Sequence, residues 1–412
     1  MAIILVTLLA VLTLSSASPL KKDYVGPRCF TDSCISSAGY LSSSMDFSVN
    51  PCDDFYQFSC GKWQEDHPFP ANLDGWDYFQ KLLYSMRTDL RKILDNTTTI
   101  GKDEPKAMSK LYDFYNGCVD ESKRNSKGYS SLIDRIKAIG GWPSVDPQWS
   151  EESYDWEEAI VKLVKLNVFP IIDFQVVMDA KDSSHPMIEI FPNLGPEDTI
   201  FIPDINFVHK FPEIIRTTEK RALANYFAII TITNLGEHTT TKMYEFINDE
   251  KLDAPEILPN ICYGYLKDLL PDLLGRLFVD KYFSPKYVRE MNGLTQLVQK
   301  SFLKSITENE WMDTQTKAEA MKKVDYIKHK VAYPEWTMRD HLLQEYYQSY
   351  NDISIDNYFT SAANVMEAKQ MQDLSQINSN FAAKSELQII DNWSSKSAFD
   401  VNAFYIFQEN AI

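Results

Sequence analysis

The chain has 412 residues, of which 44% are hydrophobic, 13% aromatic and 24% charged, a composition typical of a folded protein with a large core. Its formal net charge is -17. Because an acidic surface repels phosphate backbones, the charge argues against nucleic-acid binding.

The N-terminal residues predict a signal peptide. The chain is apolar from Ala2 to Leu14, and small residues at Ser15 and Ala17 fit a signal-peptidase site before Ser18. The alternative is a buried N-terminal helix, although such a helix would show one polar face. The run is shorter than the ~20 residues that cross a bilayer, and no other segment is apolar for long enough. We expect residues 1–17 to be removed and the mature protein to be secreted and extracellular, without a membrane span.

Periodicity of the apolar residues then predicts the elements in chain order. A polar arm over 18–50 is followed by segments with apolar residues at helical spacing. The predicted helices cover residues 76–94, 105–119, 129–139, 211–235, 257–283, 285–307, 313–330 and 356–372. Pro271 should kink or divide the fifth of these helices.

A small β component accompanies the helices. β-branched and aromatic residues predict strands at 171–178 and 187–191, joined as a hairpin across a polar turn. A further strand is predicted at 398–407, which is rich in Phe, Tyr and Val. The fold class is therefore mainly α with a small β component.

Seven blocks of sequence carry a resemblance to a known family. They are Cys29 through Trp63, Tyr112 through Asp120, Gly141-Trp142-Pro143, Phe191 through Gly195, Cys262 through Val279, Trp311 through Pro334, and Val401-Asn402-Ala403-Phe404-Tyr405. In this order they resemble the neprilysin and endothelin-converting-enzyme family of zinc metallopeptidases. The resemblance implies a two-lobed α-helical architecture, with residues 51–397 as the N-terminal peptidase region.

Two departures from the family pattern shape the prediction. A helical block of the family is absent near residues 250–259, which indicates an internal deletion. The segment 398–412 corresponds to the substrate strand, which in the family precedes a His-Glu-x-x-His zinc helix. We therefore expect a chain truncated before the zinc-binding helix.

The histidines support no zinc site of the family type. Such a site needs two His one helical turn apart, with a Glu between them that acts on the metal-bound water. No two histidines here lie three or four residues apart; they are His67, His185, His209, His238, His329 and His341. We expect no catalytic residue and no metal ligand in this chain, with zinc a cofactor of the full-length family only.

Asn402 and Ala403 are the candidate substrate-binding residues. In the family the corresponding edge strand binds the substrate peptide by strand addition, through backbone groups and the Asn amide. The alternative is an ordinary strand of a sheet.

A secreted chain is expected to form disulfides. The resemblance implies pairs Cys29–Cys34 and Cys118–Cys262, whereas the family partners of Cys52 and Cys60 are missing. These two could pair with each other, stay free or bridge to another chain. Sequons predict glycosylation at two residues, Asn96 and Asn392.

Together these features predict a secreted neprilysin-like zinc metalloendopeptidase acting on small peptides, represented by its non-catalytic N-terminal portion and inactive as given. The alternative is a secreted, non-catalytic relative that binds peptides or a partner. A third possibility is a truncated product that misfolds, because the strand at 398–407 would carry an unpaired apolar edge. The sequence predicts neither the natural substrate nor the oligomeric state.

Overall fold

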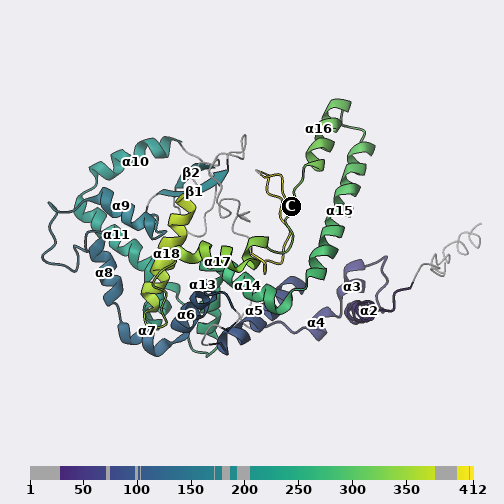
Figure 1. The fold of residues 1–412 in the computed structure, drawn as a ribbon, viewed down its shortest axis with the longest axis horizontal. Coiled ribbons are helices and arrows are strands. Elements are labelled where there is room, and N and C mark those ends of the chain that lie inside the picture. The colour runs from purple at the N-terminus through teal and green to yellow at the C-terminus, as the bar shows by residue number, and fades with distance from the viewer. Residues whose placement is uncertain are drawn as a thin grey trace, which may run out of the picture. The chain divides into compact units, whose positions relative to one another are not determined.

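The computed structural model describes residues 28–70, 75–97, 101–102, 104–170, 172–178, 186–192, 205–375, 397–407 and 409–412. The chain divides into two units, with unit 1 ending at Gln80 and unit 2 beginning at Lys81. The elements are labelled in Figure 1, and each unit is described by itself.

The described part of unit 1 contains short helices, α2 (Asp32–Ser44), α3 (Phe55–Cys60) and α4 (Trp63–Asp66). Helix α2 begins after Thr31, whose side chain accepts a hydrogen bond from the Cys34 N–H. Trp63 Nε1 donates to Tyr40 Oη over 2.8 Å and so joins α4 to α2. The sequence predicted a polar arm over 18–50 and no helix between residues 18 and 70, because the apolar residues of α2 are too few to form a recognisable stripe.

Unit 2 is almost entirely helical. Its helices are α5 (Tyr78–Asp95), α6 (Met108–Val119), α7 (Glu121–Lys127), α8 (Ser130–Ala138), α9 (Trp156–Lys165), α10 (Ile205–Thr217), α11 (Lys220–Leu235), α12 (Thr241–Asn248), α13 (Ile257–Leu269), α14 (Pro271–Tyr282), α15 (Pro285–Glu308), α16 (Thr314–Asp325), α17 (Asp340–Tyr346) and α18 (Tyr358–Ser375), with 3-10 turns η1 (Gly236–His238), η2 (Glu335–Met338) and η3 (Tyr347–Ser349). The fold class predicted from the sequence is confirmed.

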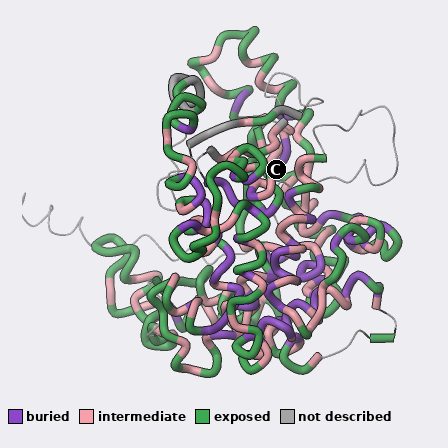
Figure 2. The backbone as a smooth tube through the Cα atoms, turned by 90° about the vertical axis from the view of Figure 1, so that its left-hand side faces the viewer, coloured by how far each residue is buried: buried purple, intermediate pink, exposed green. Residues whose placement is uncertain are grey.

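Two clusters of buried side chains form the core of unit 2. The first gathers residues of α5, α6, α13, α14 and α17, and the second gathers residues of α8, α9 and α11. Figure 2 shows buried residues alternating with exposed ones along the chain, as expected for amphipathic helices that each bury one face.

Helix α18 belongs to both clusters. Tyr358, Ala362 and Val365 pack in the first, whereas Phe359 and Ala363 pack in the second. Because residues three or four apart share a helix face, the two sets lie on different faces of α18. The helix is therefore apolar on two sides and separates the two clusters.

The predicted hairpin and the Pro271 break are confirmed. Strands β1 (Ile172–Met178) and β2 (Pro186–Pro192) pair antiparallel, with Gln175 opposite Glu189. Helix α13 ends at Leu269 and α14 starts at Pro271, because proline lacks an N–H but fits the first turn of a helix.

The helix predicted over 211–235 is two helices. α10 ends at Thr217 and α11 begins at Lys220. The hydroxyls of Thr217 and Thr218 donate to the carbonyl oxygens of Glu213 and Ile214, over 2.8 and 2.7 Å, which offers the backbone an alternative to continued helix. Helices α7, α9, α12 and α17 were not predicted.

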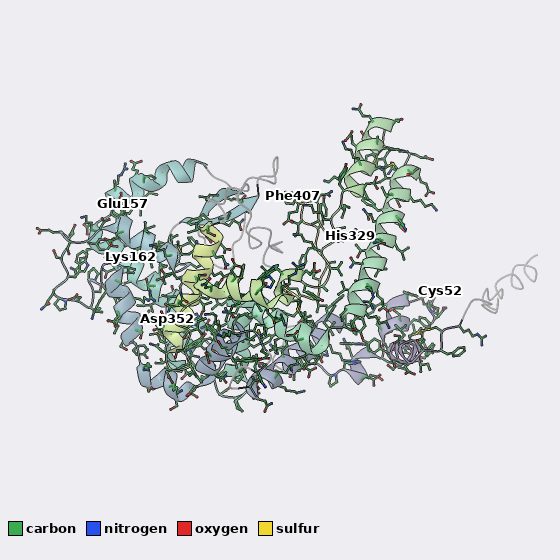
Figure 3. All side chains as sticks on the ribbon, viewed as in Figure 1. Cys52, Glu157, Lys162, His329, Asp352 and Phe407 are labelled. Carbon is green, nitrogen blue, oxygen red and sulfur yellow. A yellow bond between two sulfur atoms is a disulfide. The ribbon has the colours of Figure 1, made fainter. Side chains whose placement is uncertain are left out.

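The strand predicted over 398–407 is wrong. This segment lies outside any strand, since β1 and β2 form the sheet of the described residues and neither is its neighbour. The chain turns back instead, so that Ile406 bridges to Ala411 and Lys328 pairs with the last residues. Pairing at Lys328 also explains why α16 ends at Asp325, short of the predicted end at residue 330. Figure 3 shows the exposed side chain of Phe407 in this segment.

None of the helices in the described part of the chain is both long and apolar enough to cross a membrane.

Candidate functional site

Asn402 and Ala403 lie in an exposed loop rather than on a sheet edge. The Asn402 Oδ1 accepts a hydrogen bond from the Ala403 N–H over 2.8 Å, and the Asn402 N–H donates to the Asp400 carbonyl oxygen. Phe399, just before them, is buried in the first core cluster and fixes where the loop begins. Their role in peptide binding stays a prediction, whereas the strand on which it was placed is absent.

Both disulfides that the resemblance implies are present. Cys29 pairs with Cys34 beside the start of α2, and Cys118 on α6 pairs with Cys262 on α13. Cys52 and Cys60 are free and exposed, so they do not pair with each other in this structure.

One sequon can be placed. Asn96 is exposed in the turn after α5, where its Nδ2 donates to the Lys92 carbonyl oxygen over 2.6 Å. Asn392 lies outside the described residues.

The described histidines are scattered. His238 is buried, His329 has a buried Nε2 without a hydrogen-bond partner, and His341 is exposed on α17. Within the described ranges no group of three His, Cys, Asp or Glu side chains is placed to hold a metal ion. These residues therefore do not fit a zinc site.

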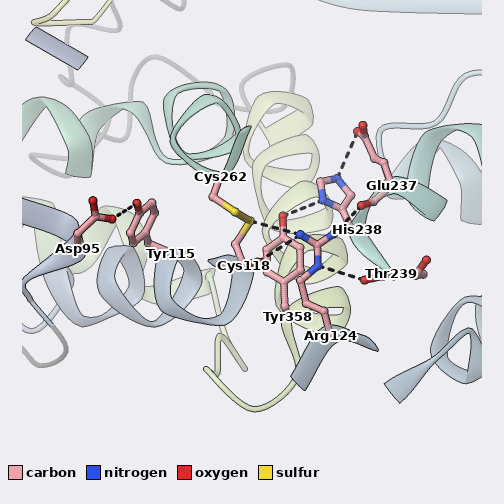
Figure 4. The surroundings of a disulfide bond; sticks show 9 residues. All are labelled: Asp95, Tyr115, Cys118, Arg124, Glu237, His238, Thr239, Cys262 and Tyr358. Atoms are coloured by element: carbon pink, nitrogen blue, oxygen red, sulfur yellow. Dashed lines mark hydrogen bonds and ion pairs between the residues drawn. A yellow bond between two sulfur atoms is a disulfide. The ribbon is translucent and has the colours of Figure 1, made fainter. Parts of the chain in front are cut away.

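A buried polar cluster surrounds the Cys118–Cys262 disulfide (Figure 4). Its centre is Arg124 of α7, which is 4% exposed. The guanidinium donates to three backbone carbonyl oxygens, those of Cys118 over 3.2 Å, Glu237 over 2.8 Å and Thr239 over 3.1 Å. It also lies over the ring of Tyr358, 4.9 Å from the ring centre, so the buried cation is well solvated by the protein.

His238 completes the cluster. Its Nδ1 lies 2.9 Å from Tyr358 Oη, and its ring is 4.5 Å from that of Tyr265. Burial first, and then the positive charge of Arg124, lowers the pKa of His238 from the ordinary 6.5 to about 3. Burial raises the pKa of the neighbouring Glu237, whose Oε1 is 3.7 Å from His238 Nε2.

This arrangement is suited to holding helices together and not to acid–base chemistry. With a pKa of about 3, His238 is neutral at physiological pH, and it is 1% exposed. A general base needs a pKa nearer the working pH and access to the proton that it removes. We therefore assign the cluster to stability.

This cluster was not predicted from the sequence. Arg124, His238 and Tyr358 are far apart in the chain, and no spacing connects them. The only signal was the Cys118–Cys262 pair, which the resemblance implied and around which the cluster is built.

Comparison with known proteins shows to which family this chain belongs. A family model described as Peptidase family M13 matches residues 51–195 and 187–334. The chain belongs to this family. The M13 chain is thus related to neprilysin and the endothelin-converting enzymes, as the seven blocks predicted.

Relatives of the M13 chain are similar over nearly all of it. Neprilysin-1 of Trittame loki is 23% identical, and the match covers 93% of this chain and 68% of the relative. Membrane metallo-endopeptidase-like 1 of Homo sapiens is 22% identical, with 94% of this chain and 64% of the relative covered. The chain thus spans about two thirds of the length of these curated relatives.

A solved structure shares the fold. An inhibitor-bound zinc metalloprotease of Mycobacterium tuberculosis superposes with a TM-score of 0.62 at 15% identity, covering 90% of this chain and 68% of the other. At this identity the likeness concerns the fold alone.

The first prediction concerns Arg124. Replacing it in the variant Arg124→Met should lower the free energy of unfolding by about 3–5 kcal/mol, because the carbonyl oxygens of residues 118, 237 and 239 lose their donor. Lys127→Met on the exposed side of α7 is the matched control and should change it by less than about 0.5 kcal/mol. Denaturant titration measures both, and equal losses would contradict the assignment.

The second prediction concerns pH. His238 takes up a proton near pH 6.5 in the unfolded chain but only near pH 3 in the folded chain. Between these values the unfolded chain binds more protons, so His238 lowers the free energy of unfolding as the pH drops. The stability of His238→Gln relative to the parent should therefore rise by about 3 kcal/mol between pH 7 and pH 4. Tyr358→Phe loses a hydroxyl but keeps the imidazole, so its stability should depend on pH like that of the parent. A constant difference between parent and His238→Gln across this range would refute the assignment.

Proposed function

We propose that this chain is the non-catalytic N-terminal portion of a secreted, neprilysin-like zinc metalloendopeptidase that acts on small peptides. The observation that carries the proposal is the M13 match over residues 51–334, in a sequence with no His-Glu-x-x-His. The helical framework would shape the enclosure for a peptide, and the chemistry would require ligands that this sequence does not contain.

The relatives support the reaction class. They include neprilysins, a membrane metallo-endopeptidase-like protein and endothelin-converting enzyme 1 of Mus musculus. In a zinc peptidase the bound metal activates a water molecule for attack on the peptide carbonyl. Because the described residues gather no ligand set for that metal, we assign no step of the reaction to them.

A secretory route is supported by three features of the chain. The first residues have the apolar pattern of a signal peptide, two disulfides form, and the acceptor Asn96 is exposed. Oxidised cysteines and an accessible sequon are both consistent with passage through an oxidising compartment.

The third prediction is that the purified 412-residue chain has no peptidase activity. Incubated with zinc and a mixture of peptides, it should yield no chelator-sensitive cleavage products by mass spectrometry, and less than one zinc per chain. A relative that contains His-Glu-x-x-His serves as the positive control in the same buffer. Cleavage by the pure chain that a chelator stops would sink the proposal of a non-catalytic portion.

The fourth prediction tests secretion separately. Expressed in eukaryotic cells, the chain should appear in the medium with Ser18 as its first residue and with a glycan on Asn96. N-terminal sequencing and the loss of mass on enzymatic deglycosylation measure these two features. Retention in the cytosol with Met1 intact would exclude secretion and leave the family assignment untouched.

A further inference from the structure

Helix α15 carries an exposed apolar stripe. Six large apolar side chains on its outer side are each between 47% and 60% exposed: Tyr287, Met291, Leu294, Leu297, Val298 and Phe302. Four of them, at 287, 291, 294 and 298, follow the alternating spacing of four and three residues that is found in helix-to-helix seams. A soluble surface rarely exposes so continuous a row of apolar side chains.

The stripe is not the face by which α15 packs in its own chain. Helix α16 lies beside α15, and both extend away from the rest of unit 2 in Figure 1. The contact between them uses Gln299, whose Nε2 donates to the Val324 carbonyl oxygen over 2.6 Å, and Thr307, whose hydroxyl lies 3.9 Å from Met321 Sδ. Ile306 is buried on that side. At 100° per residue Gln299 and Ile306 lie about a third of a turn from the centre of the stripe, and Thr307 lies nearly half a turn from it.

Charged side chains follow one edge of the stripe in a self-complementary order. Glu290 is near its N-terminal end and Lys304 near its C-terminal end, with Leu297 midway between them. Within the chain, Glu290 is 3.4 Å from Lys286, and Lys304 is 3.6 Å from Glu308. These are exposed pairs one helical turn apart, which contribute little to stability and can accept a further partner.

We propose that a second copy of this chain covers the stripe, with the two α15 helices antiparallel about a twofold axis. In the core layers of two such helices, residue i lies opposite residue j of the partner at a constant sum of their numbers. Setting Leu294 opposite the partner's Val298 then brings Met291 opposite the partner's Ser301 and Tyr287 opposite the partner's Ser305. Each layer thus sets a larger apolar side chain against a smaller side chain, a valine in one layer and a serine in two.

The same register pairs the charges along the edge. Glu290, Leu297 and Lys304 each precede a core position by one residue, and such flanking positions meet across an antiparallel pair at a sum two higher than in the core layers. Glu290 therefore faces the partner's Lys304, and Leu297 lies near the partner's Leu297 beside the axis. In a parallel pair Glu290 would instead lie near the partner's uncharged Thr295, and the two helix dipoles would be aligned unfavourably. Charge complementarity therefore selects both the second copy as the partner and the antiparallel direction.

The contact is confined to one face of a helix of 24 residues, about 36 Å long, so the interface is small and the dimer should be a reversible one. We expect the mass measured by sedimentation or light scattering to rise from one chain to two over the micromolar range. The protein for this experiment is the full chain with Cys52→Ser and Cys60→Ser, which excludes dimers linked through the two exposed thiols.

Single substitutions test the surface. Val298→Glu should weaken association at least tenfold, since it buries two unpaired carboxylates in the central layers. Phe246→Glu, which alters an 81% exposed aromatic side chain on α12, is the matched control and should leave association unchanged. Equal effects of the two would overturn the proposal.

Charge reversals test the register. Glu290→Lys and Lys304→Glu should each weaken self-association, because each sets like charges opposite one another twice. An equimolar mixture of the two variants should form a mixed dimer in which both pairs attract again. Loss of the ion pairs within each helix cannot produce association that appears only on mixing.

Other outcomes overturn the proposal outright. A mass of one chain at all concentrations up to about 100 µM would assign the stripe to a different protein or to sequence beyond this chain. A dimer that Val298→Glu does not weaken, or single variants that do not associate on mixing, would place the contact elsewhere.

Discussion

Burial of the Arg124 guanidinium is the constraint on which the middle of unit 2 depends. A cation removed from water must be surrounded by dipoles, and here three carbonyl oxygens and the face of Tyr358 supply them. The carbonyls come from the end of α6 and from η1, and Tyr358 begins α18. Three parts of the chain more than a hundred residues apart are therefore fixed around one side chain, beside the disulfide that joins α6 to α13.

Helix α18 extends that constraint to both core clusters. It carries small residues, Ser361, Ala362 and Ala363, where helices approach it from two sides. Neither cluster can rearrange without moving this helix, so the two should unfold together. The described core is held together by apolar packing, a disulfide and a buried arginine.

Local signals made much of the fold predictable. Pro271, the β-branched runs of the hairpin and the apolar periodicity of α5, α6 and α15 each act over a few residues, and these elements match. The sequence could not reveal that residues 328–330 pair with the C-terminal residues, which ends α16 early and leaves 398–407 without a neighbouring strand. The Arg124 cluster could not be predicted either, because it is formed by residues that are far apart in the chain. The four-residue spacing of Cys29 and Cys34 suits a local loop, whereas the Cys118–Cys262 pair came from the family resemblance alone.

The Cys118–Cys262 bond closes a covalent ring with a sequence separation of 144 residues, which contains the hairpin and helices α7 to α12. Closing a ring of this size removes about 5 kcal/mol of conformational entropy from the unfolded chain. It also keeps the two parts of the chain covalently joined when one peptide bond in that interval is cut. A protease that cuts once between the two cysteines hydrolyses one peptide bond but releases no segment of the chain. The nicked protein therefore keeps its second core cluster attached to the first.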